Sequence, residues 1–202
     1  MDKVYRRQAN DKIYLVIIDR LTLLISTLFI DVPTILNLII ELAEYEKSLD
    51  QVDATISSLR STLSFPSKTS STGWTQGYAK TLLILPPATK QTPDSAGNPT
   101  VAGMALYFHN YSTWTAAPGI YVEDLFVRPE FRGLGYGRAL LRELARQGLK
   151  VGCRRMDWSV LDWNQSAVDF YVSDRIGGKI MEGWKPVRVE VEDMERLAAN
   201  ND

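Results

Sequence analysis

A glycine-rich turn at residues 132–137 is the feature that most limits what this chain can fold into. The turn reads Arg-Gly-Leu-Gly-Tyr-Gly and follows the strand-like run Ile120–Val127. It leads into a helical pattern whose apolar side is formed by Leu140, Leu141, Leu144 and Ala145. Glycines let backbone amides approach an anion closely, and a helix N-terminus favours negative charge. Strand, turn and helix in this order predict a phosphate-binding site.

The spacing of the turn excludes two common nucleotide motifs. No Lys-Ser or Lys-Thr follows the glycines, and Gly-x-Gly-x-Gly is not the dinucleotide fingerprint Gly-x-Gly-x-x-Gly. The charge nearby still favours an anion, because residues 128–155 hold eight Lys or Arg against two Glu. We expect a polyphosphate-bearing ligand. The alternative is a glycine loop beside a solvated basic helix face.

Composition restricts the class of protein. The 202 residues include 23 Lys or Arg and 24 Asp or Glu, and this balance argues against a dedicated nucleic-acid binder. Hydrophobic residues make up 45%, enough for the core of one domain with at most an appendage. With a single cysteine, Cys153, and a single histidine, His109, we expect no disulfide framework and no metal site. We interpret both as structural residues and expect a cytoplasmic protein.

The remaining patterns predict a sheet with helices on its faces, in the α/β or α+β class. Apolar spacing predicts helices over residues 33–49, 51–63 and 164–175, followed by a short acidic helix at the C-terminus. Strand-like runs cover residues 79–85, 101–109, 120–127, 156–161 and 186–191.

The apolar stretch Ile13–Ile30 resembles a membrane span at first sight. Asp19 and Arg20 lie near its middle, and each such charge costs about 2.5–3.5 kcal/mol at the centre of a spanning helix. We therefore expect an extra strand or helix packed on the core. A membrane-tethered protein is the alternative.

The chain resembles the GNAT N-acetyltransferases, whose Arg/Gln-x-x-Gly-x-Gly/Ala motif is matched by the turn. Residues 42–47 (LAEYEK), 121–127 (YVEDLFV) and 163–171 (WNQSAVDFY) are similar to the diamine acetyltransferase branch, which includes spermidine/spermine and thialysine N-acetyltransferases. The resemblance covers about residues 31–197. It implies the GNAT fold, a mixed and mostly antiparallel central sheet flanked by helices.

The resemblance also implies how acetyl-CoA, the co-substrate of the family, would be held. The strand before the turn offers backbone groups to the pantetheine arm, the turn holds the pyrophosphate, and the next helix start makes a second contact. By position these are Leu125, Phe126, Val127, Arg132, Gly133, Leu134, Gly135, Tyr136, Gly137, Arg138, Asn164, Ser166 and Ala167. Asn164 also fits a plain helix N-cap.

Two residues match the catalytic positions of the family. Tyr171 would protonate the departing thiolate, and Glu123 would accept the proton of the attacking amine, directly or through water. Asp124 is expected on the opposite face of the strand, because side chains alternate. By sequence alone, Tyr171 beside Phe170 is also consistent with a core aromatic.

The family's polyamine site is matched by acids and aromatics that would hold a cation, namely Tyr45, Glu46, Glu123, Glu182 and Trp184. A solvated helix end is the alternative for Tyr45 and Glu46. Glu182 is the less secure match, because the spacing after Tyr171 departs from the family pattern.

The N-terminus departs from the family as well. The family opens with a short strand of recognisable sequence, and of that pattern this chain keeps only Asp31. Either another segment supplies this strand, or residues 1–30 derive from an alternative start or a retained intron, and we hypothesise the second. Recovery of an intact peptide spanning residues 1–20 from the native protein would contradict it. We therefore separate an atypical segment, 1–30, from a GNAT domain, 31–202.

The resemblance predicts an enzyme that transfers acetyl from acetyl-CoA directly to a primary amine of a polyamine or of a thialysine-like or lysine-like amino acid. It also implies a homodimer, with no nucleic-acid partner. The alternative from another class is a non-catalytic acyl-CoA sensor or partner-binding module on the same fold.

Overall fold

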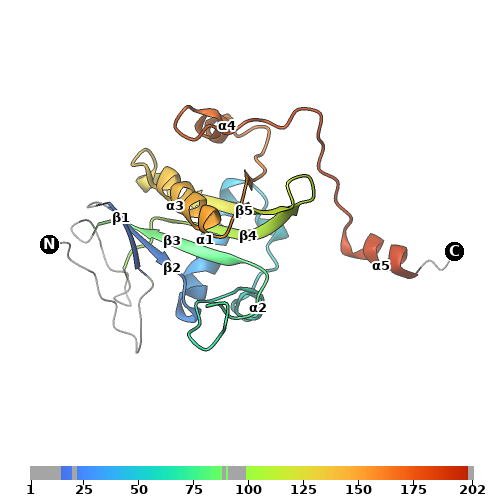
Figure 1. Cartoon of the computed structure of the whole chain (residues 1–202), viewed down its shortest axis with the longest axis horizontal. Helices are drawn as coiled ribbons and strands as arrows, with labels where there is room; N and C mark the ends of the chain where they lie inside the picture. Colours follow the sequence, from blue (N-terminus) through green and yellow to red (C-terminus); the bar gives the residue numbers. More distant parts are fainter. Residues whose placement is uncertain (1–14, 20–21, 88–89, 91–98, 200–202) are drawn as a thin grey trace. The chain divides into compact units, whose positions relative to one another are not determined.

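The computed structural model describes residues 15–19, 22–87, 90 and 99–199 of the chain. The chain divides into two compact units, residues 1–159 and 160–202, and each is described by itself. The first unit holds a six-stranded sheet in sequential order (Figure 1). Its strands are β1 (Leu15–Asp19), β2 (Thr22–Ser26), β3 (Lys80–Leu85), β4 (Gly103–Ser112), β5 (Ala117–Val127) and β6 (Met156–Asp157). Only the β5–β6 pair is parallel, so the predicted mixed, mostly antiparallel sheet is confirmed.

The apolar N-terminal stretch forms a β-hairpin, so strands precede the first helix. β1 pairs with β2, and β2 pairs in turn with β3 through Leu24 opposite Ile84. A strand therefore lies ahead of Asp31 even though the family pattern is lost there. No helix among the described residues is long and apolar enough to cross a membrane.

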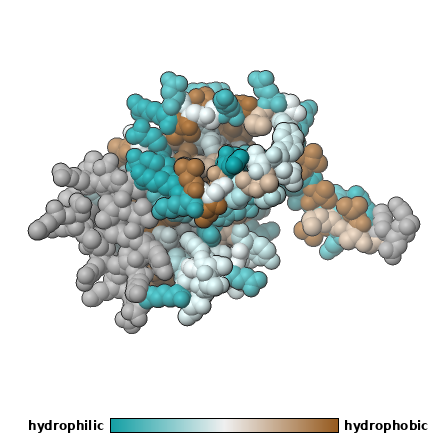
Figure 2. Space-filling view, in the orientation of Figure 1, coloured by the Kyte–Doolittle hydropathy of each residue, from teal (hydrophilic) through white to brown (hydrophobic). Residues whose placement is uncertain are grey.

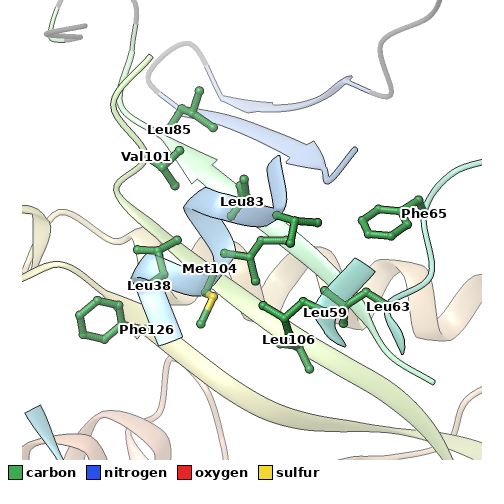
Figure 3. Packing of buried hydrophobic residues seen from close by; sticks show 12 residues of the cluster. Leu38, Leu59, Leu63, Phe65, Leu83, Leu85, Val101, Met104, Leu106 and Phe126 are labelled. Atoms are coloured by element: carbon green, nitrogen blue, oxygen red, sulfur yellow. The ribbon is translucent and has the colours of Figure 1, made fainter. Parts of the chain in front are cut away.

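Two helices cover one face of the sheet. α1 (Val32–Tyr45) buries Val32, Ile35 and Leu38 against β3, β4 and β5 (Figure 3). α2 (Ile56–Thr62) begins later than the predicted residue 51. The capping box that Thr55 and Ser58 form fixes its start, because Thr55 accepts from the Ser58 N–H and Ser58 from the Thr55 N–H.

The third helix, α3 (Tyr136–Lys150), covers the other face. Two of its own side chains, Leu140 and Leu144, are fully buried. Gly148 of α3 lies so close to the Ile120 side chain that a Cβ would crowd it. A polar link also crosses this interface, since the Tyr107 hydroxyl of β4 donates to Gln147 Oε1 at 2.7 Å. The predicted helix after the glycine turn is confirmed.

The second unit contains α4 (Gln165–Val172) and α5 (Val191–Ala199). α5 is the predicted acidic helix, and it leaves Val191, Met194 and Leu197 exposed (Figure 2). The strand predicted over residues 186–191 is wrong, because no strand pairs with this segment among the described residues. The alternation of valine with charged residues favours a strand only where a neighbour can accept its hydrogen bonds.

Candidate active site

The glycine turn forms an open cradle at the N-terminus of α3. Gly133 and Gly135 adopt φ angles of 75° and 85°, the left-handed region that favours glycine, and Gly135 occupies the N-cap position of the helix. A Cβ added at either glycine would meet nothing within 4 Å, so both face open space. The first N–H groups of a helix lack intrahelical partners, and at α3 they open into this turn. The open turn leaves space for a phosphate group, and the pyrophosphate that the resemblance implies stays a prediction.

β5 carries a β-bulge at the acidic pair. Leu106 pairs with Asp124 while Tyr107 pairs with Val122, so Glu123 is the extra residue between them. The bulge therefore interrupts the regular alternation of side chains that we expected along this strand. Asp124 shares its face with Leu106, a member of the core cluster under α1, and is not turned away from the α1 side.

Three carboxylates gather at the junction of the bulge and the end of α1. The pKa of Asp124 is raised from 3.8 to about 6, mainly by burial and in addition by the charges of Glu123 and Glu46. Glu46, which directly follows α1, also has its pKa raised by burial. Carboxylates that repel one another in this way gain free energy when a cation comes between them. The arrangement is suited to an ammonium group.

Two arginines fasten the segment before the glycine turn to α1. Arg128 makes a paired ion contact with Glu41, with N–O distances of 2.6 and 2.8 Å, and donates to the Val101 carbonyl at 2.9 Å. The guanidinium carbon of Arg132 lies 4.5 Å from the centre of the Tyr45 ring. Tyr45, a predicted amine-site residue, and the first residue of the turn are thus brought together.

The strand next to the turn leaves one of its edges without a strand. β5 and β6 pair only through Ile120 with Met156 and Tyr121 with Asp157. Beyond these residues β5 has β4 on one side and no strand on the other, within the described part of the first unit. Leu125, Phe126 and Val127 lie on this stretch. The Phe126 side chain is buried in the core.

The second unit holds six of the predicted site residues, namely Asn164, Ser166, Ala167, Tyr171, Glu182 and Trp184. Asn164 caps α4, because its side-chain oxygen accepts from the Ala167 N–H at 3.2 Å. Tyr171 is half-buried and its ring centre lies 5.2 Å from that of Phe170. Glu182 and Trp184 are exposed. Their approach to the glycine turn stays a prediction, whereas Tyr45, Glu46 and Glu123 lie in the same unit as the turn.

Sequence reasoning missed the roles of Asp124 and Glu41. Two adjacent acids inside an otherwise apolar strand marked Asp124 as unusual without indicating the bulge, and the four-residue spacing between Glu41 and Tyr45 was the signal for a shared helix face. Arg138, Arg142 and Arg146 are exposed and hydrophilic residues gather over α3 (Figure 2), which fits both the predicted anionic ligand and the alternative of a solvated basic helix face. Within the described residues, no group of three or more His, Cys, Asp or Glu could hold a metal ion.

Known proteins resemble this chain in sequence and in fold. The sequence profile of the acetyltransferase (GNAT) family matches residues 90–175. The thialysine N-epsilon-acetyltransferase of Bos taurus is 36% identical over 173 residues, which span 83% of this chain and 92% of the bovine protein. The spermidine/spermine N(1)-acetyltransferase-like protein 1 of Homo sapiens is 31% identical over 169 residues, or 83% of this chain and 22% of that protein.

A solved structure shares the fold. An aminoglycoside acetyltransferase from an uncultured soil metagenomic sample matches with a TM-score of 0.61 at 13% identity, over 84% of this chain and 97% of that one. The glycine turn, the bulged strand and these matches lead to one conclusion: the chain belongs to the GNAT acetyltransferase family and is an N-acetyltransferase.

Proposed function

We propose that the protein transfers the acetyl group of acetyl-CoA directly to a primary amine of a small cationic substrate, such as a polyamine or a thialysine-like or lysine-like amino acid. The observation that carries the proposal is the group of three carboxylates, Glu46, Glu123 and Asp124, in the same unit as the phosphate-binding turn. The names of the bovine and human relatives point to the same substrate classes.

Acetyl-CoA would be held along β5 and at the turn. The open glycine cradle and the N-terminal amides of α3 fit its pyrophosphate. The β5 edge at Leu125, Phe126 and Val127 has backbone groups without a strand partner in the described first unit, and these can bond the pantetheine amides. Acetyl-CoA supplies an activated acyl group, and the remaining chemistry belongs to side chains of the protein.

The proton transfers are assigned to Glu123 and Tyr171. Glu123 is exposed at the bulge, so it can take the amine proton directly or through water before the nitrogen attacks the thioester carbon. The C–N bond forms and the C–S bond breaks, and Tyr171 gives its phenolic proton to the thiolate. Backbone N–H groups near Phe126 would polarise the carbonyl oxygen.

Substrate selection rests on charge. Glu46 and Asp124 would attract the ammonium groups of the substrate, and Tyr45 would offer an aromatic face. By resemblance to the family, we also propose Glu182 and Trp184 as residues that bind the amine. By resemblance to the diamine acetyltransferase branch, we further propose a homodimer in the cytoplasm.

The test is release of CoA thiol from acetyl-CoA by wild type and Tyr171→Phe, with spermidine, spermine, putrescine, thialysine and lysine as acceptors. We expect turnover with at least one amine and a fall in kcat of about tenfold or more in the variant. A Phe170→Leu variant, which alters the ring that packs beside Tyr171, controls for disturbance of α4. Equal kcat values in wild type and Tyr171→Phe would remove Tyr171 from its role as the acid.

A further inference from the structure

One face of α1 holds both ends of the segment that enters the glycine turn. Glu41 and Tyr45, one helical turn apart, contact Arg128 and Arg132, which are also four residues apart. Between the arginines lies the short 3-10 turn Pro129–Phe131. We call these two contacts the α1 clamp. It joins the helix end that precedes Glu46 to the first residue of the phosphate-binding turn.

Within the α1 clamp, the side chain of Arg132 contacts residues of both α1 and β5. Its Nε donates to the Val127 carbonyl at 2.9 Å, and its guanidinium carbon lies 4.5 Å from the Tyr45 ring centre and 5.9 Å from that of Phe126. A planar guanidinium that stacks on a ring and bonds a carbonyl has one preferred orientation. The Tyr45 ring therefore helps to fix the backbone at which the turn begins.

We propose that Tyr45 is a positioning residue for acetyl-CoA, acting through Arg132 on the amides of the turn, in addition to lining the amine site. The identity of the ligand rests on the proposed function. Gly133 and Gly135 give the turn conformational freedom, so its amides converge on a pyrophosphate only where the flanking residues hold it. Arg132 provides that hold on the N-terminal side, and the first turn of α3 provides it on the other.

A consequence is that acetyl-CoA and the amine each strengthen the binding of the other. Anything that orders Tyr45, including a bound amine, also orders Arg132 and lowers the cost of arranging the turn. Binding linkage is reciprocal, so CoA strengthens amine binding by the same factor. This coupling requires no movement of either unit.

The test measures the Kd of CoA by isothermal titration calorimetry without any amine, so that a direct contact between Tyr45 and amine cannot contribute. We expect Tyr45→Leu to raise the Kd by about three- to tenfold, which corresponds to loss of one cation–π contact. Tyr45→Phe keeps the ring and should leave the Kd within about twofold. Leu42→Ala, which loosens α1 where it packs on the core, should lower the thermal midpoint without raising the Kd.

A double-mutant cycle separates this role from general damage to the fold. Arg132→Ala should raise the Kd, and adding Tyr45→Leu should raise it no further, because the second change acts through a residue already lost. In turnover at saturating amine, Tyr45→Leu should raise the KM for acetyl-CoA more than it lowers kcat.

Three outcomes overturn the inference. They are an unchanged CoA Kd in Tyr45→Leu, additive effects in the cycle, or an equal loss of CoA affinity in Leu42→Ala. Failure of wild type to bind CoA would instead overturn the proposed function, and the inference with it. CoA binding without turnover of any amine would contradict only the proposed reaction, because the Kd comparison uses no amine.

Discussion

Replacement of Asp124 by asparagine removes the carboxyl whose pKa rises from 3.8 to about 6 in the folded protein. Burial is the main cause, followed by the charges of Glu123 and Glu46. The folded state thus holds the Asp124 proton more tightly than the unfolded chain does. Asp124 therefore contributes stability below its unfolded pKa, and that contribution is lost as the pH rises through about 6.

The two pKa values set the size of the effect. Proton linkage between 3.8 and about 6 gives an unfavourable contribution to folding of roughly 2 kcal/mol at pH 5 and roughly 3 kcal/mol at pH 8. Wild type should therefore lose about 1 kcal/mol relative to Asp124→Asn when the pH rises from about 5 to about 8. The variant should be the more stable protein at the higher pH, in spite of losing a carboxylate from the amine site.

Urea unfolding of both proteins at the two pH values measures this difference, because titration of all other groups cancels between them to first order. Asp53→Asn, at an exposed aspartate in the loop before α2, is the matched control and should show no such pH-dependent gain. A difference between wild type and Asp124→Asn that is the same at both pH values would refute the burial argument. The KM for a cationic amine should rise in Asp124→Asn above pH about 7, where the wild-type group is charged.

Three further substitutions test the site and its scaffold. Gly135→Ala forces a side chain into a φ of 85°, so it should cost about 1–2 kcal/mol in urea unfolding and raise the Kd of CoA. Glu41→Gln breaks the paired contact with Arg128, and a loss of about 1–3 kcal/mol should appear as a lower thermal midpoint; an unchanged midpoint would show that the contact does not hold α1. Gly103→Ala would drive a Cβ into the Phe126 carbonyl, so we expect little folded protein by circular dichroism.

The sequence predicted those parts of the fold that depend on local pattern. The glycine turn, the helix that follows it and the Asn164 cap are local features, and each is confirmed. Helix ends were less accurate, because Thr55 lies inside a pattern that looked helical from residue 51. The strand predicted over residues 186–191 failed for another reason. Alternation identifies a segment able to pair, but a partner strand has to exist.

The adjacent acids on β5, Glu123 and Asp124, show which part of the site the sequence pattern could not predict. Strict alternation predicted that Asp124 lies on the face opposite Glu123, and the extra residue in the strand register interrupts that alternation. A bulge depends on how β4 pairs with β5, which no single strand sequence contains. The clamp between α1 and the turn is likewise a tertiary contact, joining residues 87 positions apart.

The most direct measurement is identification of the product by mass spectrometry after the purified protein is incubated with acetyl-CoA and an equimolar mixture of polyamines, thialysine and lysine. The account predicts one added acetyl group on a primary amine of at least one of these, with stoichiometric formation of CoA. It also predicts that the Glu46→Gln/Asp124→Asn double variant turns that amine over with a higher KM. Hydrolysis of acetyl-CoA with no acetylated amine, or no consumption of acetyl-CoA at all, would contradict the account.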